Sequence, residues 1–184
     1  MKNFVRTACA LAMLFLLTGN AHSDDKHKDK GTLLHARLIG FQEVPSVSTV
    51  ATGELHARIN PGDSSIDYTL TYSGLQGTVQ QAHIHVAQRS VNGSIVIWFC
   101  GTTTNPGPAG TPTCTLGFGT FTGTATAANV VAGATASQQL AAGELAEVIA
   151  AIRGGVAYAN VHTNLSPGGE IRGQIRVVHG EHRD

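Results

Sequence analysis

The sequence predicts a mainly β protein with a single domain, either an antiparallel β-sandwich or a Greek-key barrel, with one short helix near residues 143–153. Three observations carry this prediction. Apolar and polar residues alternate over several short segments, as they do in strands that bury one face. The chain contains 22 Gly residues, and clusters of Gly and Pro separate these segments as turns. One segment alone replaces the two-residue period with helical spacing.

The strands follow from the alternation. It begins at residue 32, recurs around residues 55–59, and is clearest over residues 66–72 (IDYTLTY). Residues 60–63 (NPGD) form the turn before this strand, and Asn92-Gly93 is typical of a hairpin turn. We expect further strands at residues 79–86, 94–100, 116–125, 156–163 and 170–178.

The predicted helix lies in an Ala- and Glu-rich segment. Leu145, Val148, Ile149 and Ile152 follow helical spacing, and Gly154-Gly155 ends the pattern. We interpret this apolar stripe as one that packs into the core of the domain.

The N-terminus has the pattern of a secretory signal peptide. Lys2 and Arg6 form a basic start, residues 8–17 are an uncharged apolar run, and Ala21-His22-Ser23 provides small residues before a cut at Asp24. We therefore predict a signal peptide at residues 1–23, a flexible leader at 24–31, one domain at 32–178 and a flexible tail at 179–184. A periplasmic or secreted location follows from this prediction.

The charge of the mature chain excludes a nucleic-acid footprint. Removal of Lys2 and Arg6 leaves 10 Lys and Arg residues against 12 Asp and Glu residues, a net charge of −2. Nucleic-acid binders carry a basic patch or stripe, and none is evident here. We also expect no membrane span in the mature chain, because no later segment approaches the roughly 20 apolar residues that a helix needs to cross a bilayer.

Two cysteines remain after the signal peptide is removed, Cys100 and Cys114. An even number of cysteines in an exported chain predicts a disulfide bond. The other interpretation is a thiolate metal site, but the spacing is wider than the two to four residues that usually separate paired zinc ligands.

The sharpest candidate for chemistry is a pair of histidines on a predicted strand. His83 and His85 are two residues apart, so their side chains project from the same face within reach of one ion. His162, at the end of another strand, is the best third ligand. Three imidazoles suit copper or zinc, and binding is expected to weaken as the pH falls below about 6.5. The alternative is that all three are structural residues that hydrogen bond locally.

Glu170 and Arg172 follow the turn after His162 and share a strand face. We expect them to pair with each other or to support the histidine cluster, with Glu170 as a ligand or an outer-shell acceptor. His35 and His56 fall on the polar faces of predicted strands, where we expect them to be exposed to solvent. No nucleophile elbow, P-loop or dinucleotide fingerprint occurs, and no catalytic residue is assigned.

At these residues the sequence resembles the CHRD (chordin-type) domain, in a stand-alone bacterial form. The resemblance rests on three blocks of the chain. They are residues 38–45 (LIGFQEVP), residues 82–85 (AHIH) and a closing block made of residues 155–163 (GVAYANVHT) and 167–174 (PGGEIRGQ). It implies a β-rich exported domain without an established reaction. The His-x-His strand also resembles that of copper/zinc superoxide dismutases, although no counterpart of their zinc loop is recognisable.

Three classes of function follow. The first is an exported protein that binds a metal ion, copper before zinc, through His83, His85 and His162. The second is a metal-free interaction or structural module whose partner is another exported protein. The third is a metalloenzyme similar to superoxide dismutase. The sequence alone assigns neither an enzymatic activity nor an oligomeric state.

Overall fold

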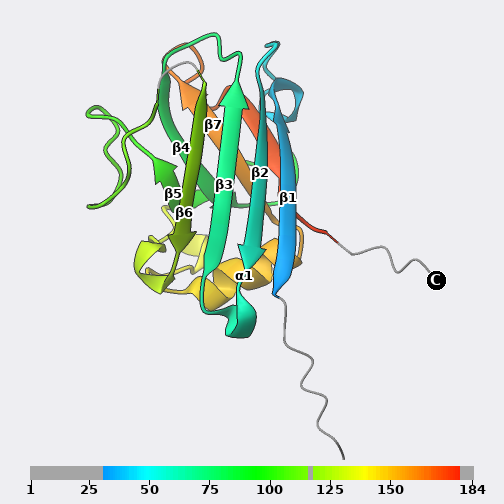
Figure 1. Cartoon of the computed structure of the whole chain (residues 1–184), viewed down its shortest axis with the longest axis vertical. Coiled ribbons are helices and arrows are strands. Elements are labelled where there is room, and N and C mark those ends of the chain that lie inside the picture. Colours follow the sequence, from blue (N-terminus) through cyan, green and yellow to red (C-terminus); the bar gives the residue numbers. More distant parts are fainter. Residues whose placement is uncertain (1–30, 116–117, 179–184) are drawn as a thin grey trace, which may run out of the picture.

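The computed structural model describes residues 31–115 and 118–178, which form one nearly closed β-barrel with a helix at one end (Figure 1). Neighbouring strands of its nine-stranded sheet are antiparallel, in the order β5-β4-β7-β8-β1-β2-β3-β6, with β9 paired to β1. The strands are β1 (Thr32–Ile39), β2 (Thr52–Ile59), β3 (Ile66–Ser73), β4 (Val79–Val86), β5 (Ser94–Cys100), β6 (Gly119–Ala125), β7 (Ala157–Thr163), β8 (Ile171–Gln174) and β9 (Arg176–Val177). The predicted mainly β fold is confirmed.

The connections explain how distant segments become neighbours. β1, β2 and β3 form a meander with an unbroken register, as their alternating sequences predict. The chain then crosses to the β4–β5 hairpin and returns to place β6 beside β3. After β6 it crosses again, and β7 inserts between β4 and β8. This last crossing places residues about 80 positions apart side by side on β4 and β7.

The two ends of the sheet, β5 and β6, approach each other without pairing along their length. Tyr68 of β3 and Phe99 of β5 span this gap, with ring centroids 4.7 Å apart. Apolar residues of the inner faces fill the barrel, among them Leu38, Leu55 and Leu70, which are fully buried. Burial of such side chains, each contributing about 1.5–3 kcal/mol, is the main stabilising term.

The helix α1 (Leu145–Arg153) lies across one end of the barrel (Figure 1). It agrees with the prediction, and its four apolar residues at helical spacing are all buried. Arg153, at the end of the helix, donates two hydrogen bonds to the Asp63 carboxylate at 2.6 and 2.7 Å. This exposed pair ties the helix to the turn before β3.

Strand limits differ from the prediction by more than a shift of one residue in two places. The segment predicted at 170–178 divides into β8 and β9 at Ile175, which is buried and donates its backbone N–H to Ala157. The segment predicted at 116–125 begins as a strand at Gly119, while residues 116–117 lie outside the described part of the chain. The predicted signal peptide, most of the leader and the predicted tail also lie outside it. Among the described residues, no helix is long and apolar enough to cross a membrane.

A second buried layer lies on the outer side of β4, β7 and β8. All seven residues of β7 are buried, so loops must cover the face that is turned away from the core. The Asn92 side chain donates to the Val44 carbonyl, which joins two of these loops. The layer is polar, and its buried residues are Glu43, His83, His85, Asn160, His162, Arg172 and Gln174.

The predicted disulfide bond between Cys100 and Cys114 is confirmed. It closes a loop in which the Cys114 N–H donates to the Gly101 carbonyl. Gly107 of this loop packs on Trp98, where any side chain at Gly107 would overlap the indole ring. The disulfide therefore holds this loop over the Trp98 ring.

Replacing both cysteines with Ser is expected to lower the free energy of unfolding by about 3 kcal/mol, because the unfolded chain regains the entropy of an open loop. For a domain of this size the melting temperature should fall by roughly 10 °C. Wild-type protein in a reducing agent should have the same melting temperature as the double variant. Equal melting temperatures for oxidised and reduced wild type would contradict the prediction.

Candidate metal centre

Strand pairing brings the three predicted ligands together. His83 and His85 lie on β4, and His162 lies on the neighbouring strand β7. Asn160 is opposite His83 in the register of the two strands, and His162 is two residues further along the same face. The cluster is thus built by one antiparallel pair of strands.

Alternation along β4 separates this face from the barrel core. Ala82 and Ile84 are part of the hydrophobic core cluster. His83 and His85 point the opposite way, into the outer polar layer, where they are 0 and 6% exposed. Their rings are buried beneath loops rather than among the aliphatic side chains of the barrel.

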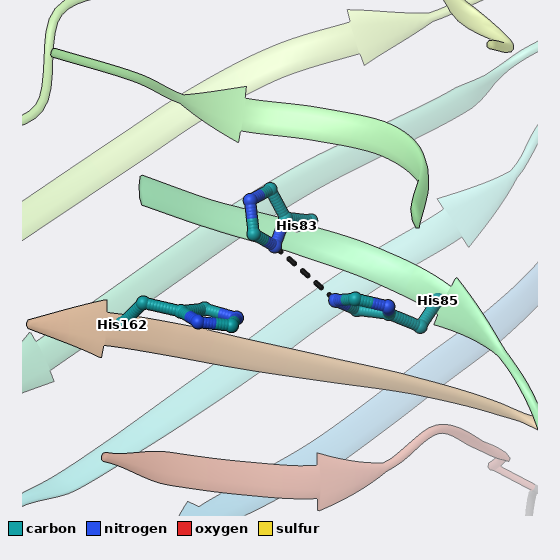
Figure 2. A group of neighbouring side chains, drawn as sticks. All are labelled: His83, His85 and His162. Carbon is teal, nitrogen blue, oxygen red and sulfur yellow. Dashed lines mark hydrogen bonds between the residues drawn. The ribbon is translucent and has the colours of Figure 1, made fainter. Parts of the chain in front are cut away.

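The three imidazoles face a common point (Figure 2). His83 Nδ1 is 3.2 Å from His85 Nε2. One ring nitrogen from each of His83, His85 and His162 lies within 4.8 Å of the other two. Two nitrogens that bind one ion at 2.0–2.1 Å with tetrahedral geometry would be about 3.3 Å apart. The spacing therefore suits a single ion after small movements of the rings.

Backbone carbonyl groups fix the tautomers of two rings. His85 Nδ1 lies 2.9 Å from the Gly93 oxygen, and His162 Nδ1 lies 2.8 Å from the Pro167 oxygen. A carbonyl oxygen only accepts hydrogen bonds, so both Nδ1 atoms carry hydrogen. Each neutral ring must then present the lone pair of Nε2. A metal ligand needs this lone pair, and an acceptor on the other ring nitrogen is the usual support.

Unpaired buried polar atoms concentrate at this cluster. In the described part of the chain, three buried side-chain nitrogen or oxygen atoms have no hydrogen-bond partner. Two of them are His83 Nε2 and His162 Nε2, and the third is Glu43 Oε1. Each such atom costs about 1–3 kcal/mol, so their grouping at one place points to a function.

Burial keeps the cluster uncharged. It lowers the pKa of His83 well below its usual value, and the neighbouring His162 and His85 lower it further. Burial also lowers the pKa of His85 to about 4 and lowers the pKa of His162. Neutral imidazoles are the form that binds metal, so protons should compete with a metal only at a lower pH than the 6.5 expected for free imidazole.

Aromatic rings enclose the cluster on two sides. Trp98 meets His83 edge to face, with ring centroids 4.5 Å apart. Tyr158 stacks on His85 at 4.6 Å with the two planes almost parallel. The Arg172 guanidinium lies over the Tyr158 ring, 3.4 Å from its centre. The aromatic contacts restrict the orientation of both histidines on β4.

A buried carboxyl group is linked to His83 through Asn160. Asn160 Oδ1 lies 3.4 Å from His83 Nδ1, and the Asn160 side chain also lowers the pKa of Glu43. Burial raises the pKa of Glu43 to about 7, although the charge of Arg172 acts in the opposite direction. Gly169 leaves room for this carboxylate, since a Cβ atom there would overlap it.

Glu170 and Arg172 are both buried but bond to different partners. The Glu170 carboxylate accepts from Thr49 Oγ1 and Thr163 Oγ1 and from the backbone N–H groups of residues 76 and 77. Arg172 donates to the Asn92 side chain and to the carbonyl groups of residues 88 and 91. The ion pairs of the described residues do not include one between Glu170 and Arg172.

A second group with ligand-type side chains lies on the surface of β1 and β2. His35 and His56 are paired across the two strands, and His35 Nε2 is 2.6 Å from Glu54 Oε2. All three are at least partly exposed to solvent. This agrees with the exposure expected for the two histidines, and the group lacks the burial that distinguishes the first cluster.

Sequence reasoning missed four residues around the cluster, namely Glu43, Trp98, Tyr158 and Asn160. Two of them carried a usable signal, because Tyr158 and Asn160 precede His162 by four and two residues and must share its face. The contacts of Glu43 and Trp98 depend on a loop and on another strand. No local pattern in the sequence predicts these contacts.

Comparison with known proteins identifies the family of this chain. A family model described as the CHRD domain matches residues 34–175, which include every strand from β1 to β8 in part or in full and all three histidines. Comparison with curated proteins and with solved structures gave no match. The match covers well over half of the 184 residues. The chain therefore belongs to the CHRD domain family.

Proposed function

We propose that this chain is an exported CHRD-type binding protein that holds one divalent metal ion between His83, His85 and His162, with copper favoured over zinc. The observation that supports this most directly is the convergence of three buried imidazoles, with one ring nitrogen from each within 4.8 Å of the other two. His85 and His162 present lone pairs that backbone carbonyl groups fix in place. His83 completes the set when its Nδ1 proton moves to Nε2, which is unpaired.

The donor set favours copper. It consists of neutral imidazole nitrogens, and the nearest cysteines are held in a disulfide and offer no thiolate. With nitrogen ligands of equal geometry, the divalent series places copper above zinc. The three histidines are 0, 6 and 7% exposed, which favours binding over turnover at an open metal position.

Export is supported by the disulfide bond. Such bonds persist in oxidising compartments outside the cytoplasm. The basic start and apolar run of the N-terminus fit the same route, although they precede the described residues. The proposed location is the periplasm or the extracellular medium.

Trp98 provides the test, because it is the only Trp of the chain and its ring contacts His83. Protein without an affinity tag should be titrated with Cu(II) and with Zn(II), with calorimetry and Trp fluorescence recorded together. We expect one ion per chain at this site and strong quenching by Cu(II), which is paramagnetic. Substituting His85 with Ala should weaken this binding by more than the roughly 100-fold that an outer-shell change can cost.

The matched control is the double variant His35→Ala, His56→Ala, which removes the exposed histidine pair and should bind like the wild type. Ions that bind elsewhere would release heat without quenching Trp98. Equal quenching in wild type and in His83→Ala, His85→Ala and His162→Ala would contradict the proposal. Absence of binding by the wild type would also contradict it and would favour a metal-free interaction module.

A further inference from the structure

Two adjoining cavities lie outside the barrel, beside the histidine cluster. Their volumes are about 280 and 240 Å³. They share Gln42, Arg89 and Gln174 in their linings, so they adjoin each other, and we call the two together the arginine groove. It runs between the loop that carries Glu43 and the loop that carries Arg89, and over the outer face of β8.

Positive charge is concentrated in this groove. Four of the six basic residues in the described part of the chain line it, and no Lys falls in that part. These four are Arg37, Arg89, Arg172 and Arg176. Within the described ranges 31–115 and 118–178, the two ion pairs are His35–Glu54 and Arg153–Asp63, so none of the four is neutralised by a carboxylate contact.

Arg172 is the fixed element of the groove. Its side chain is 2% exposed, and its hydrogen bonds go to neutral acceptors, the Asn92 side chain and two backbone carbonyl groups. These bonds hold the loop at residues 88–92, which carries Arg89 at the rim. Arg37, Arg89 and Arg176 are exposed and can turn toward a ligand.

The acidic groups that face the groove do not cancel this charge. Glu43 lines it, but its pKa of about 7 leaves the carboxyl group partly protonated at neutral pH. Glu54 lies opposite Arg37 in the strand register, and its carboxylate bonds to His35. The same arginines disfavour a second cation at the His35–Glu54–His56 group.

We propose that the arginine groove binds a small organic anion that carries carboxylate or phosphate groups. Guanidinium groups match both groups with paired N–H donors. Phe41, Val44 and Pro45 form an apolar wall of the larger cavity and suit the carbon skeleton of such a ligand. The combined space suits a small molecule rather than a polymer. This inference goes beyond the proposed metal function, because no residue of the groove is a proposed ligand of the ion.

Metal-free protein tests the proposal by calorimetric titration. The probes are succinate for carboxylates and inorganic phosphate for phosphates, with glycerol as the uncharged comparison. We expect at least one of the two anions to bind, more tightly at low salt than at 0.15 M salt, and glycerol not to bind. Arg89→Gln and Arg176→Gln should each weaken this binding by about tenfold, since each removes charged hydrogen bonds.

Arg58→Gln is the matched control, because Arg58 is also exposed and lies on β2 outside the groove. It should leave the affinity unchanged, and all three variants should melt like the wild type because they alter exposed side chains. The His83→Ala variant should bind the anion normally, which separates this result from the outcome of the metal experiment. No binding of either anion at low salt, or equal losses in all three Arg variants, would overturn the proposal.

Discussion

Replacing Glu170 with Gln is expected to lower the free energy of unfolding by about 3 kcal/mol. The Glu170 carboxylate is 1% exposed and accepts four hydrogen bonds, two at each oxygen. The amide nitrogen of Gln would face two of these donors and could accept from neither. Each donor left unpaired in a buried position costs about 1–3 kcal/mol. Urea denaturation at neutral pH measures the change.

Glu54→Gln is the control for this substitution, because Glu54 is partly exposed and should cost much less. Copper affinity measured on folded Glu170→Gln should stay within a few-fold of the wild type, since the four partners of Glu170 do not include an imidazole. A 10–100-fold loss of affinity would instead identify Glu170 as an outer-shell support of the cluster. Unchanged stability would contradict the structural role.

Mild acid should destabilise the protein by roughly 3 kcal/mol between pH 6.5 and pH 5. His83, His85 and His162 all have a lowered pKa in the folded chain, so below pH 6.5 the unfolded chain binds more protons than the folded chain. Each such histidine contributes up to about 1.4 kcal/mol per pH unit. Their stabilising effect is complete above pH 6.5 and is lost as the pH falls toward the folded values.

Glu43 acts in the opposite sense. Its pKa is raised from 4.5 to about 7, so between these pH values the folded chain keeps a proton on Glu43 that the unfolded chain has released. The stabilisation that Glu43 contributes is therefore lost as the pH rises through 7. The three histidines outweigh this single carboxyl group below pH 6.5. Glu43→Gln should therefore raise stability at pH 8 and steepen the loss in acid.

Denaturation at several pH values tests both effects. His85→Gln should reduce the slope below pH 6.5 by about one proton. A flat profile from pH 6.5 to pH 5 would show that the histidines do not titrate as their burial requires.

Local patterns predicted the elements of this fold and the three members of the cluster. The two-residue period located β4 and β7, and it also implied that His83 and His85 share a face. His162 could be proposed as their partner only because it ends a strand. The pairing of β4 with β7 joins segments about 80 residues apart, and no local pattern encodes that register.

The supporting contacts were less predictable, because loops make them. Glu170 precedes β8, and the partners of Glu170 and Arg172 come from loops near residues 49, 76 and 88–92. A two-residue period gives the direction of a side chain and says nothing about which loop covers it. We expected these two residues to pair because their charges are opposite. In the structure, Glu170 accepts hydrogen bonds from other donors, and Arg172 donates to other acceptors.

The division of β4 into a core face and an outer face has a consequence for divergence within the family. Ala82 and Ile84 are needed to fill the barrel, whereas His83 and His85 contact only the outer layer and its loops. Selection on folding and selection on any ligand that the outer layer binds therefore act on alternate residues of one strand. A related domain can lose or exchange its histidines while the barrel stays intact, so shared architecture does not require a shared ligand.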